Sequence, residues 1–564
     1  MRSNWILHET PSKEQIDAMV LKTGATRLVA AVLCSRGFTS ESAYAFLSKD
    51  VSCLHDPFLF PDMEKAVQCI YSAIEAGKKI TVYGDYDADG ITASALMVDC
   101  LRRLSANADF YIPERENEGY GMSRHALQYL SDHGTELIVS VDCGITAMDE
   151  CIFAKELGMD VIVTDHHECS GTIPDAVAVI NPKITNSPYP DKNLAGVGVA
   201  LKLCQALLLS AQSPEQTALD YAELITLGTV ADIVPLCGEN RILCDMGLKK
   251  IPQSQNNGFK ALLSVSDLIG KQIDTTVVGF QLAPKINAVG RLSDAALAVE
   301  MFLTPNENRA MEIADILSAC NVKRQKIEQE ILEVAVHRVE TEYKNDAVLV
   351  LSDKNWHHGV VGIVASRLTK KYNKPCILIS PGADGLYKGS GRSLTGFSLY
   401  DALTACSEHL DRFGGHELAA GLVIEEKKVD IFRKAINDYA FSVLHGEPLL
   451  PVEEVDLELR GRHLNLECAK ELLALEPFGS GNKSPLFIIK DMYVNRISTL
   501  GAEGQHLKMQ FIKDGCAIDA IAFSFADKIH LTYGSTVTVL AHLEVNSFRG
   551  TESAQLKITD MEVR

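Results

Sequence analysis

The chain lacks the long apolar segments that membrane insertion and secretion require. Its 564 residues contain no run of about 18 or more apolar side chains, so we expect no helix that crosses a membrane. Residues 1–9 reach charged side chains too early for the apolar core of a secretory signal. Together these two absences predict a cytosolic location.

Paired cysteines are also missing. The sequence has 15 cysteines, and none forms the Cys-x-x-Cys pair that is typical of zinc sites and dithiol redox motifs. Most lie in apolar segments, as Cys69, Cys100, Cys204 and Cys376 do. We interpret them as reduced, buried cysteines that act as small hydrophobic side chains.

Positive charge is scarce. The chain has 54 Lys and Arg against 74 Asp and Glu, a formal net charge of −20. This balance argues against broad electrostatic attraction to duplex nucleic acid. It still allows a metal site rich in carboxylates, and one local basic groove could hold a strand.

What the sequence does contain is a regular alternation of strands and helices. We predict strands at 80–83, 137–141 and 161–164 and helices at 91–103 and 147–157. This spacing predicts an α/β fold with a parallel sheet covered by helices on both faces. The same pattern resumes at residue 347.

The length predicts three or four domains, at about 150 residues each. We expect a helical N-terminal segment at 1–60, an α/β domain at 61–304, a connecting helix at 305–345 and a second α/β domain at 346–446. Residues 308–343 contain neither proline nor glycine, as a long helix requires. Short alternating strands at 447–564 predict a small β-barrel.

The strongest local signal is an acidic cluster directly after the first predicted strand. Asp85, Asp87 and Asp89 lie within five residues and repel one another unless a cation lies among them. A solvated acidic turn is the plain alternative. A calcium-binding EF-hand loop is a second alternative, but its twelfth position, a glutamate, is Leu96 here, so that interpretation fails.

Two further predicted strands end in similar side chains. Asp142 follows the strand at 137–141, and Asp165-His166-His167 follows the strand at 161–164. Ligands of open α/β sheets bind at the carboxyl ends of the strands, so Asp87, Asp89, Asp142 and His166 should meet at one edge. Asp232 follows a predicted helix, and either a metal ligand or a helix-end residue fits its position.

Several carboxylates with one or two imidazoles form a site for hard to borderline metals. Carboxylates suit Mg²⁺ and Mn²⁺, and imidazole shifts the preference toward Mn²⁺. More than four oxygen ligands favour two ions, which together activate a water and stabilise a leaving oxygen in phosphoryl displacement. Phosphate ester hydrolysis is therefore the reaction class we predict.

These residues resemble the DHH phosphoesterase family, which is named for the triplet seen here as Asp165-His166-His167. Five further motifs resemble the RecJ branch of that family, and the resemblance runs from about residue 60 to the end. They are Asn193 to Ala200, Pro284 to Leu292, Gly389 to Ser393, Phe413 to His416 and Glu476 to Asn482. The resemblance implies a DHH domain, a DHH-associated second α/β domain and an OB-fold-like barrel.

The resemblance also implies an activity and roles for residues. The activity would be 5′→3′ exonuclease action on single-stranded DNA, releasing 5′-mononucleotides with Mn²⁺ or Mg²⁺. The implied metal ligands are Asp87, Asp89, Asp142, His166 and Asp232. His167 would contact the scissile phosphate or orient the nucleophile, and Asp85 would be a further ligand or support one.

A glycine-rich motif predicts a phosphate clamp. The glycines of Gly389-Ser390-Gly391 let backbone amides approach a phosphate, and Arg392 offers a bidentate fork. We predict that Arg291, Ser390 and Arg392 hold a terminal 5′-phosphate, although either Arg could instead form a salt bridge. The remaining candidate substrate-binding residues are Gly391, Ser393, Gly415 and His416. For His416, a helix cap is the alternative.

The C-terminal segment fits DNA binding less well. Residues 451–564 carry 12 Lys and Arg against 16 Asp and Glu, a balance of −4. Phe511, Phe523, Phe525 and Phe548 are candidate base-stacking residues, with burial in the core as the alternative for most of them. Arg549 beside Phe548 is the pair that we expect to be exposed.

Three functions remain open from the sequence. The first is the RecJ-like exonuclease, with a helicase and a single-strand-binding protein as partners by analogy. The second is a DHH phosphodiesterase of short oligonucleotides or cyclic dinucleotides, against which the extra barrel counts. The third is a non-catalytic DNA-binding relative, against which the intact set of acids and histidines counts. Strand polarity rests on the resemblance alone.

Overall fold

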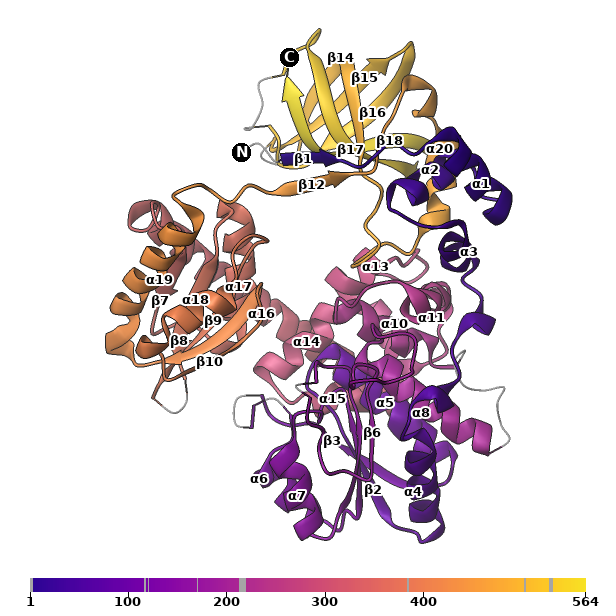
Figure 1. The fold of residues 1–564 in the computed structure, drawn as a ribbon, viewed down its shortest axis with the longest axis vertical. Helices are drawn as coiled ribbons and strands as arrows, with labels where there is room; N and C mark the ends of the chain where they lie inside the picture. Colours follow the sequence, from indigo (N-terminus) through magenta and orange to yellow (C-terminus); the bar gives the residue numbers. More distant parts are fainter. Residues whose placement is uncertain are drawn as a thin grey trace. The chain divides into compact units, whose positions relative to one another are not determined.

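The structure is a computed structural model that describes residues 4–115, 118–119, 121–169, 171–211, 220–382, 385–501, 504–526 and 531–563 (Figure 1). The chain forms two compact units. The sheet unit comprises Asp56–Asp232 and Met246–Leu450. The barrel unit comprises Met1–His55, Ile233–Asp245 and Pro451–Arg564.

A five-stranded parallel sheet lies at the centre of the first part of the sheet unit. Its strand order is β3-β2-β4-β5-β6, and each neighbouring pair is parallel. The strands are β2 (Lys79–Tyr83), β3 (Asn107–Tyr111), β4 (Leu137–Val141), β5 (Asp160–Thr164) and β6 (Ala178–Ile180). Every residue of β4 is buried, as expected for a strand that is covered on both faces.

Helices cover both faces of this sheet, which confirms the predicted α/β fold. α6 (Arg124–Asp132) and α7 (Met148–Glu156) pack on one face, in a core with Ile138 and Val161. α4 (Met63–Glu75), α5 (Ala88–Arg103) and α8 (Gly196–Ser210) contact the strands from the other face (Figure 1).

A series of helices follows the parallel sheet. They are α10 (Ala222–Ala231), α11 (Gly238–Lys250), α12 (Asn257–Ser264), α13 (Thr275–Val277), the π-helix η5 (Val278–Leu282), α14 (Ala283–Leu292), α15 (Ala296–Leu303) and α16 (Glu307–Thr341). α16 confirms the uninterrupted helix predicted for this segment. Its middle carries a buried ion pair, with Arg324 Nη1 2.5 Å from Glu328 Oε2.

The second sheet of the sheet unit is mixed, with the order β10-β11-β9-β8-β7. Only β7 and β8 are parallel. The strands are β7 (Leu349–Ser352), β8 (Cys376–Pro381), β9 (Tyr387–Arg392), β10 (Arg412–Gly415) and β11 (Ala419–Ile424). α17 (His358–Tyr372) packs with α16 in one core, and α18 (Leu399–Ala405) and α19 (Val429–Leu444) belong to another.

The barrel unit contains a closed β-barrel, as predicted. β14 pairs with both β15 and β17, which closes the ring β14-β15-β16-β18-β17. Its strands are β14 (Phe487–Leu500), β15 (His506–Lys513), β16 (Cys516–Ala522), β17 (Thr536–Phe548) and β18 (Thr551–Val563). Three of them have 13 or 14 residues, longer than the short strands we expected.

The N-terminal segment packs on this barrel. α1 (Lys13–Thr23), α2 (Arg27–Ser35) and α3 (Ser40–Ser48) share a hydrophobic core with the barrel strands. The expectation that the segment is wholly helical was wrong at its start. Residues Asn4–Leu7 form strand β1, which pairs in parallel with β12 (Val452–Val455). Such a distant partner leaves no local signal in the sequence.

In the described part of the chain, no single helix is long and apolar enough to cross a membrane. Only α1 and α2 taken together meet that test by length and composition, and they are bent by 114° at the break between them.

Candidate metal centre

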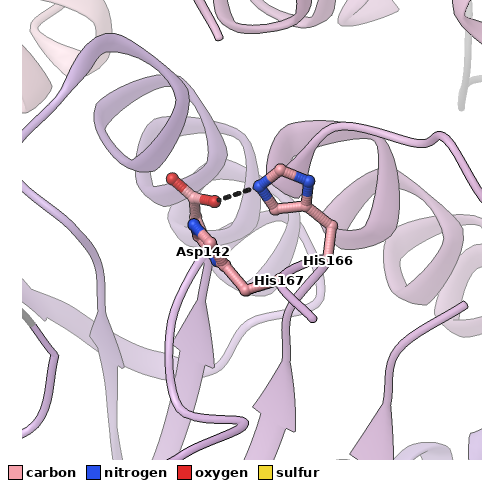
Figure 2. Close-up of side chains that lie close together, drawn as sticks. All are labelled: Asp142, His166 and His167. Atoms are coloured by element: carbon pink, nitrogen blue, oxygen red, sulfur yellow. Dashed lines mark ion pairs between the residues drawn. The ribbon is translucent and has the colours of Figure 1, made fainter. Parts of the chain in front are cut away.

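The loops after β2, β4 and β5 bring the predicted ligands together at the carboxyl edge of the parallel sheet. Side chains of Asp and His meet there in three overlapping groups, and in each group the ligand atoms lie within 4.8 Å of one another. The groups are Asp142, His166 and His167; Asp89, His166 and Asp232; and Asp85, Asp87 and Asp142. Figure 2 shows the first group, with Asp142 pointing toward His166. All seven side chains predicted for the centre therefore lie close together in space.

Asp87 and Asp89 are held by the first turns of two helices. Asp87 is the N-cap of α5, and its Oδ1 accepts hydrogen bonds from the amides of Asp89 at 2.9 Å and Gly90 at 3.1 Å. Asp89 reaches α8 instead: its Oδ2 accepts from Gly196 N at 2.7 Å and its Oδ1 from Val197 N at 2.9 Å. Helix N-termini favour negative charge, so both carboxylates lie where free backbone amides can donate to them.

Asp142 lies in the left-handed backbone region, with φ of 60°, directly after β4. α8 begins so close to it that a Cβ on Gly196 would lie 2.3 Å from Asp142 Oδ1. A glycine at the start of α8 thus makes room for the carboxylate. Asp142 Oδ1 is 3.2 Å from His166 Nε2.

Gly196→Ala should therefore weaken metal binding. Alanine favours a helix by up to about 1 kcal/mol over glycine, but its methyl group would displace the Asp142 carboxylate. We expect the Mn²⁺ dissociation constant, measured by calorimetry, to rise at least about 10-fold. Gly198→Ala is the matched control in the same helix, because its Cβ would meet only the Leu194 side chain, at 3.2 Å. Equal affinities in both variants would contradict the prediction.

His166 lies between two carboxylates. Its Nε2 is 3.2 Å from Asp142 Oδ1 and 3.6 Å from Asp232 Oδ2. Burial and the positive charge of His167 lower the pKa of His166 to about 3, so the imidazole is neutral at physiological pH. A neutral imidazole is the form that ligates a metal.

The position of Asp232 is compatible with both of the alternatives left open by the sequence. It is the C-terminal capping residue of α10, and its carboxylate also belongs to the group with Asp89 and His166. Burial and the charge of Asp87 raise its pKa to about 7.

His167 is positioned by Asp165, a residue to which the sequence analysis gave no role of its own. Asp165 Oδ1 accepts from His167 Nδ1 at 2.7 Å and from two backbone amides, and its Oδ2 accepts from Ile145 N at 2.9 Å. Burial alone would raise the pKa of Asp165, but His167 and these amides hold it below its usual value. Burial would lower the pKa of His167, but Asp165 raises it. The His167 side chain is 42% exposed, so a ligand can reach it.

The buried carboxylates of this centre suit a divalent cation. Burial, followed by the charge of Asp87, raises the pKa of Asp85 to about 8, and Asp85 Oδ1 accepts no hydrogen bond from the residues that the structure describes. Burial and neighbouring acids also raise the pKa of Asp89 and Asp142. Such crowding is costly without a cation, and an oxygen-rich set with one imidazole fits Mn²⁺ or Mg²⁺.

Without metal, the melting temperature should fall as the pH rises from 5 to 9. The folded-state pKa of Asp85, about 8, and of Asp232, about 7, lie above the unfolded value of about 4. The stability from these groups is thus complete below the unfolded pKa and is lost as the pH rises through the folded pKa. Melting curves in chelator test this expectation, and Mn²⁺ should flatten the fall. A curve in chelator that rises with pH would contradict it.

The sequence pattern did not single out several residues that support the centre. Asn287 Oδ1 accepts from Ala88 N at 2.8 Å, and a Cβ on Gly290 would lie 2.5 Å from Tyr86 O, so α14 packs directly on the acidic loop. Asn181 is fully buried after β6 and donates to His167 O at 3.0 Å. For Asn181 a sequence signal was available, because it is a polar residue directly after a strand, as several of the predicted ligands are.

The predicted phosphate clamp also comes together, around the first turns of α17. Arg291 Nη1 donates to Gly359 O at 2.6 Å. Arg392 Nη1 donates to Gly391 O at 2.7 Å and Ser390 Oγ at 3.2 Å, and a Cβ on Gly362 would lie 2.8 Å from Ser390 Oγ. Burial and the charges of Arg115, Arg324 and Arg392 lower the pKa of Arg291 to about 10.

A cavity of about 570 Å³ lies within the sheet unit beside the acidic loop, and its lining includes one residue of the predicted clamp, Arg291. Its lining includes Tyr86, which lies between Asp85 and Asp87, and the cations Arg115, Arg291 and Lys388. The charge around this cavity suits an anionic ligand.

Of the predicted substrate-binding residues, Arg291 alone lines this cavity. Ser393 Oγ donates to Phe397 O at 2.7 Å. Gly415 ends β10, and His416 N donates to Ala419 O at 2.8 Å in the turn before β11. The helix-cap alternative for His416 was wrong, because a strand follows this turn.

The four candidate stacking residues of the barrel divide into two pairs. Phe511 and Phe525 are buried, as the core alternative predicts. Phe523 and Phe548 are exposed, and the Arg549 guanidinium lies 5.1 Å from the centre of the Phe548 ring. An exposed aromatic ring with a cation is a common platform for a nucleobase.

Models of three families match the chain. The model of the DHH family, N-terminal domain, matches residues 79–229. The DHHA1 domain matches residues 328–441, and the RecJ OB domain matches residues 455–560. The three matches follow one another along the chain, in the order of the two sheets and the barrel.

Known proteins extend the similarity to nearly the whole chain. The single-stranded-DNA-specific exonuclease RecJ of Bacillus subtilis is 36% identical over 558 residues, which cover 98% of this chain and 70% of the relative. A crystal structure of RecJ with Mn²⁺ from Thermus thermophilus matches with a TM-score of 0.85 and 30% identity, covering 99% of this chain and 79% of that one. A structure of the same protein with Mg²⁺ matches at 0.80 and 28%, covering 99% and 78%. The chain therefore belongs to the RecJ family of DHH proteins.

Proposed function

We propose that this chain is a metal-dependent exonuclease that degrades single-stranded DNA from the 5′ end and releases 5′-mononucleotides. The observation that carries the proposal is the gathering of Asp and His side chains at the edge of the parallel sheet, next to a cavity lined by cations. Relatives named as single-stranded-DNA-specific exonucleases support the same activity.

The metal ligands in this proposal are Asp87, Asp89, Asp142, His166 and Asp232, with Asp85 as a further donor. Mn²⁺ or Mg²⁺, bound as a pair, would supply an activated water and stabilise the leaving oxygen of the phosphodiester. His167, held by Asp165 through Nδ1, contacts the scissile phosphate or orients the nucleophile. Neutral His166 keeps a lone pair for the metal.

The clamp residues set the end of the strand that is attacked. Arg291, Ser390 and Arg392 bind the terminal 5′-phosphate. Gly391 in β9 and Ser393 directly after it position the backbone around them. A phosphate held there places the first diester of the strand toward the acidic loop, because Tyr86 of that loop lines the same cavity as Arg291. Gly415 and His416 contact the backbone further along the strand.

We also propose the cellular setting. The enzyme would act in the cytoplasm, in DNA repair and recombination. A helicase would supply unwound strands, and a single-strand-binding protein would accompany them. The exposed Phe523, and Phe548 with Arg549, would bind the strand on the barrel.

The direct test uses 3′-labelled single-stranded DNA with and without a 5′-phosphate, incubated in Mn²⁺. We expect mononucleotides to leave from the 5′ end, blunt duplex to survive, and chelator to abolish the activity. Degradation of di- or trinucleotides alone would show a small-substrate phosphodiesterase instead. Binding of single strands without cleavage would show a non-catalytic relative.

A further inference from the structure

The segment after β6 runs beside the DHH triplet. β6 pairs in parallel with β5, with Thr164 opposite Ile180, so the chain leaves both strands side by side. Asp165 N donates to Ile180 O at 3.0 Å, which continues the pairing past the end of β5. The residues that follow, Asn181 to Lys183, are therefore neighbours of His166 and His167.

Asn181 fixes this segment to the triplet. Its side chain is fully buried, and its Nδ2 donates to His167 O at 3.0 Å. Its Oδ1 accepts from Lys183 N at 2.8 Å. One buried amide side chain thus links the backbone of His167 to that of Lys183, so His167 and Lys183 are held next to each other.

The Lys183 side chain turns toward the triplet. Its Nζ forms an ion pair with Oε1 of Glu168, and Glu168 directly follows His167 in the chain. Lys183 is therefore a cation at the end of the loop that carries His166 and His167.

The ion pair between Lys183 and Glu168 does not explain why Lys183 lies beside the triplet. Lys183 Nζ lies 3.1 Å from Glu168 Oε1, but the Glu168 side chain is 71% exposed. Such a solvent-screened pair is weak, so it can open when an anion arrives. The Lys183 side chain is 26% exposed, so it is open to solvent in part.

We propose that Lys183 is a further catalytic residue, whose ammonium contacts a non-bridging oxygen of the scissile phosphate opposite His167. This rests on the proposed nuclease function. A cation fixed next to the phosphate stabilises the negative charge that builds up on its oxygens during displacement. Because the charge grows in the transition state, the contact acts on kcat more than on KM.

The test compares Lys183→Ala, Lys183→Arg and Glu168→Ala with the wild type on 5′-phosphorylated single strands. We expect Lys183→Ala to lower kcat about 100-fold, with KM and the Mn²⁺ dissociation constant changed less than about 3-fold. Lys183→Arg should recover part of kcat. Glu168→Ala breaks the same ion pair but keeps the cation, and should leave kcat within about 2-fold.

Three results with the alanine variants would overturn the inference. They are an unchanged kcat in Lys183→Ala, an equal loss in Glu168→Ala, and a loss of Mn²⁺ binding in Lys183→Ala. The last two would assign Lys183 a structural role. Melting curves identify misfolding, and Lys183→Arg then decides, since an inactive but folded Arg variant also counts against the inference. A wild type that leaves single strands intact would instead refute the proposed function itself.

Discussion

Asp142→Asn should abolish nuclease activity and at the same time stabilise the metal-free protein. Asparagine keeps the shape of the side chain and tolerates the positive φ of this position, so the backbone has no reason to move. The substitution removes one buried charge from a cluster in which Asp89, Asp87 and Asp85 raise the pKa of Asp142, after burial itself. It also removes a charged oxygen that would ligate the metal.

Two measurements separate these effects. The rate on single-stranded DNA in Mn²⁺ should fall at least about 100-fold, because metal ligation and the activated water depend on this carboxylate. The melting temperature in chelator should rise, since repulsion among the buried carboxylates is relieved, and the stabilisation by Mn²⁺ should shrink. This is the trade-off expected when a site stores unfavourable charge for function.

Asp160→Asn is the matched control. Asp160 lies exposed at the start of β5, away from the carboxyl edge of the sheet, so neither rate nor melting temperature should change. If Asp142→Asn keeps full activity, Asp142 is not a metal ligand. If it lowers the melting temperature in chelator, the carboxylate is stabilised by contacts that outweigh the repulsion.

Arg291→Met should remove the preference for a 5′-phosphate. The guanidinium is close to Arg115, Arg324 and Arg392, whose charges lower its pKa after burial does, and it lines the cavity beside the acidic loop. Methionine keeps most of the apolar stem and removes the charge. A lost hydrogen bond to a charged group corresponds to about 1.5–3 kcal/mol, or roughly 10- to 100-fold in affinity.

The informative quantity is the ratio of KM values for 5′-phosphorylated and 5′-hydroxyl strands. We expect KM for the phosphorylated strand to rise about 10- to 100-fold, while KM for the hydroxyl strand changes little. Arg102→Met, at an exposed position near the end of α5, should leave both values unchanged. An equal rise for both strands in Arg291→Met would place Arg291 on the strand backbone rather than on the terminal phosphate.

The gathering of these Asp and His side chains was predictable because its signal is local. A carboxylate or imidazole close behind a strand rich in β-branched residues can be recognised without knowledge of distant residues. Parallel strands then bring their carboxyl ends to one edge of the sheet. Asp85, Asp87, Asp89, Asp142, His166 and His167 all follow this rule. Asp232 does not follow a strand, and its place beside His166 depends on how α10 packs.

The supporting residues were not predictable in the same way. Asp89 is held by amides of α8, Ala88 by Asn287 of α14, and His167 by Asn181 after β6. Each partner is an ordinary polar group or glycine whose importance appears only once two helices or strands lie together. Gly196 shows this most clearly, because only the packed structure places Asp142 where its Cβ would be.

The sequence by itself determined the α/β alternation, the long helix α16, the strand-end acids and the absence of a Cys-x-x-Cys pair, since each depends on residues close together in the chain. Tertiary structure alone decided which helix N-terminus holds Asp89, that Arg291 and Arg392 meet at α17, and that β1 pairs with β12. It also decided that Lys183 lies beside the triplet. These are contacts between distant segments, and their free energy comes from packing, burial and electrostatics that no local pattern records.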